Sequence, residues 1–146
     1  GVGGHAEAYE SPEDCLLRET FEETGLTLTD YRFRGLVTFA LKGVETQYMC
    51  LYTASSWEGE LDYDCREGDL EWVPKEQIRD LELWVGDKVF FKLLEQEVPF
   101  FSLKLAYDGD TLEECVLDGK ELDWREFLGG GGRWGGKIWK AAFPIC

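Results

Sequence analysis

The chain has 146 residues, of which 44% are hydrophobic and 14% are aromatic. This length corresponds to about one domain of ~100–200 residues, and the composition is that of a globular protein rather than a disordered polar segment. The formal net charge of −15 is opposite in sign to that of proteins that bind nucleic acid backbones, so nucleic acid polymers are not expected partners. The excess acid either serves solubility or holds cations, and composition alone leaves both interpretations open.

The cysteines and the histidine exclude several kinds of site. None of the five cysteines forms a C-x-x-C pair, so we expect no zinc knuckle and predict free thiols in a reducing compartment. His5 is the only histidine, which argues against a Ser-His-Asp triad and a multi-histidine metal site. No apolar run approaches the ~20 residues that span a bilayer, and no signal peptide is recognisable. These features predict a cytoplasmic protein without a membrane partner.

Both ends of the sequence differ from the rest. The chain opens on a glycine-rich run without a Met, which leads us to expect that an N-terminal segment is missing. Residues 129–146 contain six glycines, three basic residues and no acid, so residues 1–128 carry −18 and the tail carries +3. This shift predicts a domain over 1–128 and a disordered appendage over 129–146. A tail that touches an acidic partner or a membrane surface is the alternative.

The first predicted element is a helix over residues 12–24. Ser11 suits the cap position, Pro12 suits the first helical position, and Asp14 stands where the acid of a capping box belongs. Gly25 provides a C-terminal stop. Four consistent signals therefore define this helix.

The remaining elements alternate without a regular βαβ pattern. In chain order, we predict strands over 36–41 and 48–53 joined by a turn at 42–43, a short strand over 70–73, a helical turn over 74–79, a helix over 88–96 capped by Asp87, and a hairpin of strands 100–107 and 111–117. This mixture indicates an α+β arrangement rather than a doubly wound sheet.

The 12–24 helix carries an unusual acidic face. Glu19, Glu22 and Glu23 stand at i, i+3 and i+4, within an arc of roughly 100°. Like charges at this spacing, near the C-terminal end of a helix, destabilise it. Hard cations such as Mg²⁺ or Mn²⁺ would remove the repulsion, and Arg18 can pair with Glu22. We expect the opposite side of the helix to pack on a sheet through Leu17, Thr20, Phe21 and Thr24. A merely solvated acidic face is the alternative.

The loop before the helix completes a longer pattern. Gly4 is followed after five residues by Glu10, and after seven more by Arg18-Glu19-Thr20-Phe21-Glu22-Glu23-Thr24-Gly25-Leu26. This pattern resembles the Nudix box, G-x5-E-x7-R-E-U-x-E-E-x-G-U, at every fixed position. The departure is Thr20, because U is usually a bulky aliphatic residue. Seven fixed residues and an aliphatic Leu26 at the last U, over 23 positions, make the resemblance to the Nudix hydrolase superfamily specific.

The resemblance implies hydrolysis of a nucleoside diphosphate linkage with Mg²⁺, or Mn²⁺, as cofactor. It implies Glu19, Glu22 and Glu23 as metal ligands, one of which doubles as base, and Arg18 as part of the catalytic group. The carbonyl of Gly3 is the implied backbone ligand, and Glu67 is the best match for an acidic ligand outside the box. A surface position among Asp62, Asp64 and Asp69 is the alternative for Glu67. The loop residues implied to contact substrate are Val2, Gly3, Gly4 and His5.

A second resemblance lies at residues 83–87, which are similar to the purine-contacting stretch of MutT-like 8-oxo-dGTP diphosphatases. It implies that Trp84 stacks on the base and that Asp87 hydrogen-bonds its edge. Gly86 stands where the animal enzyme has an acid, so the identical readout is not implied. A core or hinge aromatic is the alternative for Trp84.

The implied fold is an α/β/α sandwich around a mixed β-sheet that lacks its N-terminal strands. The leading functional hypothesis is hydrolysis of an oxidised purine dNTP, bound with Mg²⁺, to the monophosphate and pyrophosphate, by a monomer or homodimer. A Nudix hydrolase for ADP-ribose or a dinucleotide, and a non-catalytic Nudix-like binding module, are the alternatives.

Overall fold

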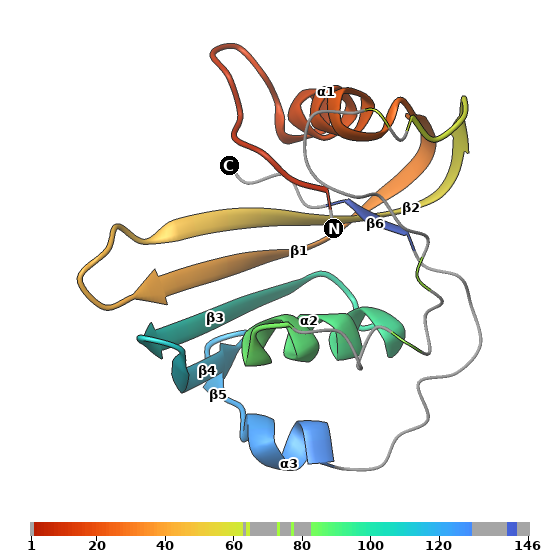
Figure 1. The fold of residues 1–146 in the computed structure, drawn as a ribbon. Coiled ribbons are helices and arrows are strands. Elements are labelled where there is room, and N and C mark those ends of the chain that lie inside the picture. Colours follow the sequence, from red (N-terminus) through yellow and green to blue (C-terminus); the bar gives the residue numbers. More distant parts are fainter. Residues whose placement is uncertain are drawn as a thin grey trace. The chain divides into compact units, whose positions relative to one another are not determined.

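The computed structural model of the chain describes residues 2–62, 64, 73, 77, 83–129 and 140–142, the last of these by their backbone only. The chain divides into two compact units. The first comprises Gly1–Arg34, Met49–Trp72 and Trp139–Cys146, and the second comprises Gly35–Tyr48 and Val73–Ile138. The elements of both units are labelled in Figure 1. Within the described residues, no helix is long and apolar enough to cross a membrane.

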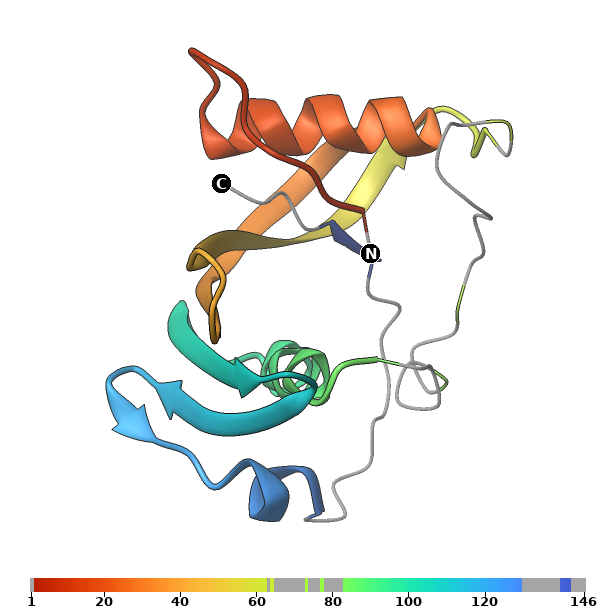
Figure 2. The same ribbon diagram turned by 60° about the vertical axis from the view of Figure 1, so that its left-hand side comes forward.

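The first unit contains α1 (Pro12–Thr24), which confirms the predicted helix at both ends. Ser11 and Asp14 form the reciprocal capping box, and Gly25 ends the helix in the left-handed conformation at φ 77°. Figure 2 shows α1 lying along the part of the sheet that this unit contributes.

The buried stripe of α1 differs from the predicted one. The buried residues are Cys15, Leu16, Thr20 and Thr24, whereas Phe21 is 58% exposed. At about 100° per residue, this stripe is rotated toward the side of Glu19 and Glu23. The expectation that Phe21 packs on the sheet is therefore wrong, and the two glutamates gain partial burial instead.

Strands β1 (Thr27–Leu41) and β2 (Gln47–Glu58) are both longer than predicted. The early part of β1 is polar, and its side chains bond those of β2. Thr29 Oγ1 lies 2.8 Å from Ser56 Oγ, and Arg34, which is 2% exposed, donates to Thr53 Oγ1 at 3.1 Å. Because these polar residues interrupt the apolar pattern, the sequence predicts only the apolar end of β1.

The second unit contains α2 (Val85–Glu95), β3 (Phe101–Asp108), β4 (Thr111–Leu117), β5 (Lys120–Glu121) and α3 (Trp124–Gly129). The 100–107 and 111–117 hairpin is confirmed as β3 and β4. The α2 helix begins at Val85 rather than Lys88, and its cap position is Trp84. The prediction that Asp87 caps this helix is therefore wrong, because Asp87 lies inside its first turn.

The strands follow the hydrogen-bonded order β5-β4-β3-β1-β2-β6. β1 and β3 pair in parallel from Gly35–Phe101 to Leu41–Tyr107, while β3–β4 and β4–β5 are antiparallel. β6 (Lys140–Ala142) pairs antiparallel with β2. A mixed sheet with helices confirms the predicted fold class.

Several predictions fall largely outside the described residues. They concern the 70–73 strand, the 74–79 turn, Glu67, Cys65, Cys146 and most of the 129–146 tail. Among the described cysteines, Cys15, Cys50 and Cys115 are buried thiols that form no disulfide.

Candidate active site

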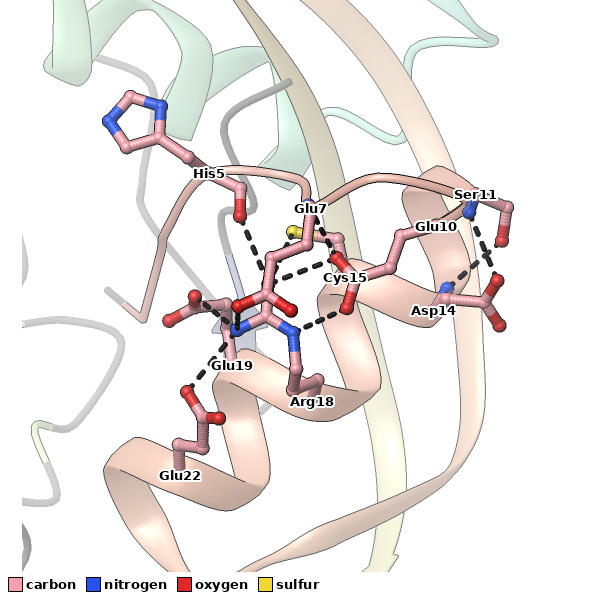
Figure 3. Close-up of polar contacts among 9 residues, drawn as sticks. All are labelled: His5, Glu7, Glu10, Ser11, Asp14, Cys15, Arg18, Glu19 and Glu22. Carbon is pink, nitrogen blue, oxygen red and sulfur yellow. Dashed lines mark hydrogen bonds and ion pairs between the residues drawn. The ribbon is translucent and has the colours of Figure 1, made fainter.

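Arg18 is the centre of a polar cluster between α1 and the loop that precedes it (Figure 3). Its Nε and Nη2 donate to the two oxygens of Glu10, the second at 3.0 Å. Its Nη1 donates to Glu19 Oε1 at 2.7 Å and to Glu22 Oε2 at 3.2 Å, and its Nη2 donates to the carbonyl of His5 at 3.0 Å. One guanidinium therefore ties the loop to the helix and to two of the predicted metal ligands.

The electrostatics of the cluster fix Glu10 as an anion. The hydrogen bonds from Arg18 and from the backbone N–H of Glu7, at 2.8 Å, lower the pKa of Glu10 to about 2. The hydrogen bonds to Glu10 and Glu19 in turn raise the pKa of Arg18 above its ordinary value. Both charges persist across the whole neutral range, so the Glu10–Arg18 pair holds the loop throughout that range.

The glycine loop packs directly against the other edge of the acidic face. The backbone N–H of Gly3 donates to Glu23 Oε2 at 3.2 Å. A Cβ at Gly4 would lie 2.1 Å from Glu19 Cδ, so only glycine leaves room for that carboxylate. The loop therefore binds Glu23 through the backbone amide of Gly3, and the missing side chain of Gly4 leaves space for the Glu19 carboxylate. The close approach of Glu19 explains why position 4 is a glycine.

Gly4→Ala is expected to lower kcat/KM about 10- to 100-fold with little loss of stability. The added Cβ meets the flexible end of the Glu19 side chain, so that carboxylate moves aside while the backbone stays. A displacement of about 1 Å in a catalytic group costs on the order of 100-fold in rate. The measurements are steady-state kinetics and thermal unfolding by circular dichroism. A variant that retains full activity would show that Glu19 is not needed where the structure places it.

The oxygen donors suit a hard divalent cation, although they do not converge in the present arrangement. Among the described residues, no group of three or more His, Cys, Asp or Glu side chains is placed to hold a metal ion. Arg18 Nη1 binds one oxygen each of Glu19 and Glu22, and the N–H of Gly3 binds Glu23, so one oxygen of each carboxylate is already engaged. Carboxylates are the ligands that Mg²⁺ and Mn²⁺ prefer. The donor chemistry therefore fits such a cation, and joint coordination requires the glutamate side chains to reorient.

The predicted base-contacting residues lie in the second unit, at the start of α2. Trp84 is 51% exposed, and its ring meets the ring of Tyr107 at a centroid distance of 5.0 Å and an angle of 82°. The N–H of Gly86 donates to the Tyr107 hydroxyl at 2.9 Å. Burial raises the pKa of Asp87 above its usual value. The structure thus brings together Trp84 and Asp87 and adds Tyr107, which the sequence patterns did not indicate.

Two loop residues predicted to contact substrate have different surroundings. Val2 is partly buried at the start of the loop. His5 is exposed, and its imidazole points away from the carboxylates while its carbonyl accepts from Arg18 (Figure 3). The observed contribution of His5 to the cluster is therefore made by its backbone.

Comparison with known proteins identifies the class of this domain. The NUDIX domain family matches residues 1–94, which is more than half of the chain. The chain belongs to the Nudix hydrolase family, as the motif from Gly4 to Leu26 predicts.

Individual relatives add detail to this assignment. The chain is 33% identical to the Nudix hydrolase YvcI of Bacillus subtilis, in an alignment that covers 58% of this chain and 56% of YvcI. The chain therefore spans little more than half the length of this relative. It is 29% identical to the oxidized purine nucleoside triphosphate hydrolase of Danio rerio, over 81% of this chain and 76% of that protein. The crystal structure of the mutator MutT protein from Bacillus halodurans matches with a TM-score of 0.72 and 29% identity, covering 79% of this chain and 78% of that one.

Proposed function

We propose that this protein hydrolyses a nucleoside diphosphate linkage with Mg²⁺, and that its preferred substrate is an oxidised purine dNTP such as 8-oxo-dGTP, cleaved to the monophosphate and pyrophosphate. The observation that carries the proposal is the carboxylate cluster of α1, anchored by Arg18 and packed against the glycine loop. Three like charges on neighbouring turns have no benefit for helix stability. A divalent cation bound by the three carboxylates would explain them.

Glu19, Glu22 and Glu23, with the carbonyl of Gly3, are the residues that would hold the cation. A bound divalent ion neutralises phosphate charge and makes a water molecule more acidic. Arg18 keeps Glu19 and Glu22 on the side of the loop, and it stays charged throughout the neutral range. The chain's own contribution is therefore to orient oxygen donors and to hold the loop beside them.

The preference for a purine rests on the second unit. Trp84 is large, half-exposed and suited to stacking on a base, and Asp87 follows it within one helical turn. The oxidised form is supported by the activity for which the Danio rerio relative is named and by the MutT likeness. The α1 cluster does not contribute to this preference, because it would serve the diphosphate whatever the leaving group is.

The test is a panel of substrates for the full chain, containing 8-oxo-dGTP, dGTP, dCTP, ADP-ribose and a dinucleotide, with Mg²⁺, with Mn²⁺ or with EDTA. We expect hydrolysis that depends on the metal, releases pyrophosphate rather than orthophosphate, and has a kcat/KM for 8-oxo-dGTP at least about tenfold above that for dCTP, since a stacked and hydrogen-bonded base contributes ~1–3 kcal/mol. Chromatography of the nucleotide products identifies the bond that is cut.

The other outcomes each contradict a separate part of the proposal. Equal and weak activity on all substrates overturns the oxidised-purine preference but keeps the enzyme class. A higher kcat/KM for ADP-ribose or the dinucleotide assigns another Nudix substrate. Absence of turnover, with no Mg²⁺-dependent shift of the unfolding temperature, supports a non-catalytic module.

A further inference from the structure

The first turn of α2 lacks the side-chain cap that most helices have. Its cap position is Trp84, which makes no capping hydrogen bond. The backbone N–H of Gly86, one of the groups left without a partner inside the helix, instead donates to the hydroxyl of Tyr107 at 2.9 Å. Tyr107 is on β3 and is 4% exposed. A residue 21 positions away thus supplies the acceptor that the local sequence does not.

The same hydroxyl occupies the space that a side chain at position 86 would need. A Cβ at Gly86 would lie 2.3 Å from the Tyr107 oxygen and 2.6 Å from Leu105 Cδ1. Such approaches do not occur in real structures without displacement of one group. Gly86 and Tyr107 therefore depend on each other, because only glycine admits the hydroxyl and the hydroxyl satisfies the glycine amide.

Tyr107 also contacts the ring of Trp84. The two rings meet almost perpendicularly, at 82° and 5.0 Å between centroids, which is a favoured geometry for aromatic pairs. In this arrangement Tyr107 leaves at least one indole face uncovered, consistent with the 51% exposure of Trp84. A flat base can stack on that face.

Asp87 lies beside Trp84 and Gly86 at the start of α2. It is partly buried in the first turn of α2, directly after the glycine that Tyr107 holds. Burial, together with the charge of Asp87, raises the pKa of Tyr107 to about 12, so the phenol stays neutral at physiological pH.

We propose that Tyr107 is the positioning residue of a purine site formed by Trp84 and Asp87, holding the indole through its ring and the start of α2 through its hydroxyl. This inference rests on the proposed function, because it takes the site to receive the base of the nucleotide. It adds that residues 86 and 107 jointly determine base selectivity, whereas the cluster on α1 does not distinguish between bases.

The test is Tyr107→Phe, which keeps the ring beside Trp84 and removes only the hydroxyl. We expect the KM for 8-oxo-dGTP to rise about tenfold and kcat to change less than about twofold, because loss of the Gly86 acceptor displaces Trp84 and Asp87. With 2′-deoxyribose 5′-triphosphate, which has no base, kcat/KM should not change. Tyr48→Phe, at an exposed tyrosine of the same unit, is the matched control and should behave as wild type.

A second variant tests the dependence between the two positions. Gly86→Ala should raise the KM for 8-oxo-dGTP as Tyr107→Phe does, because its Cβ expels the hydroxyl. In the double variant the missing hydroxyl removes the closer of the two clashes of that Cβ, and only the approach to the end of the Leu105 side chain is left, so the loss should be smaller than the product of the two single losses. Losses that multiply independently would contradict the coupling.

The results separate this inference from the proposed function. Equal loss of kcat/KM on the purine and the base-free substrate in Tyr107→Phe would indicate a general structural role and overturn the inference. If the wild type turns over no nucleotide, the proposed function fails and 8-oxo-dGMP binding, measured by tryptophan fluorescence against Trp84→Phe, decides the role of Tyr107. Binding about tenfold weaker in Tyr107→Phe supports the role, and equal binding overturns it.

Discussion

Glu22→Gln is expected to lower kcat/KM for the metal-dependent reaction by about 10²- to 10⁴-fold, while the unfolding temperature stays within a few degrees of wild type. The substitution keeps the shape of the side chain and removes the charge that would bind the cation. A Lewis-acidic metal contributes several kcal/mol to phosphoryl transfer, and each 1.36 kcal/mol corresponds to a factor of ten in rate. Steady-state kinetics at saturating Mg²⁺, with thermal unfolding, measures both quantities.

The small effect on stability follows from the surroundings of Glu22. Its side chain is 53% exposed, and its ion pair with Arg18 spans 3.2 Å at i, i+4. Exposed pairs of this kind contribute about 0–1 kcal/mol, and removal of a negative charge near the C-terminal end of a helix offsets part of that loss. Glu22→Gln should therefore reduce activity with little change in stability.

Glu58→Gln provides the matched control, because Glu58 is an exposed glutamate at the end of β2 in the same unit. It should retain wild-type kinetics and stability. If Glu22→Gln kept metal-dependent turnover within tenfold of wild type, the assignment of Glu22 as a metal ligand would be wrong. If it lost turnover only because it unfolded, the thermal transition would be displaced as well.

The helix of the site was predictable from local chemistry. Ser11, Asp14 and Gly25 act on the backbone within a few residues of themselves, so the bounds of α1 follow from the sequence. The spacing of Glu10 and Arg18 placed both at fixed positions of the motif. Their bidentate contact, which ties the loop to the helix, became visible only in the structure.

Other features depend on residues far apart in the chain, and no local pattern encodes them. The buried stripe of α1 is determined by the strands beneath it, so helical periodicity placed Phe21 on the wrong side. The role of Tyr107 requires the pairing of β3 with its neighbours, which brings its hydroxyl to Gly86. The early part of β1 was missed because Arg34 is buried through a partner on β2.

Gly35→Ala is expected to destabilise the fold more than Gly4→Ala does. Gly35 is buried in β1 and lies opposite Phe101 where β1 and β3 begin to pair in parallel. A Cβ at this position would lie 2.6 Å from the carbonyl oxygen of Phe101 and 3.0 Å from its ring. Phe101 is fully buried, so neither group can move without parting the strands. Glycine is therefore required by the close approach of two backbones.

The expected size of this effect follows from two opposing terms. Overpacking of this kind destabilises the fold by about 1–3 kcal/mol. Alanine also restricts the unfolded chain more than glycine does, which stabilises the folded state by about 0.4–1 kcal/mol. The steric term prevails because a backbone carbonyl, unlike the flexible end of Glu19 near Gly4, cannot turn away. We expect a net loss of about 1–2 kcal/mol, or roughly 2–8 °C in unfolding temperature.

Gly129→Ala separates the steric effect from the general effect of replacing a glycine. Gly129 lies at the end of α3, and an added Cβ would meet nothing within 4 Å. Its replacement should leave stability unchanged or raise it slightly, since alanine favours helix. If Gly35→Ala behaved like Gly129→Ala in thermal unfolding, β1 and β3 would have to be further apart in solution than the parallel pairing at Phe101 allows. The stability of Gly35→Ala therefore tests how closely the two strands approach each other at Phe101.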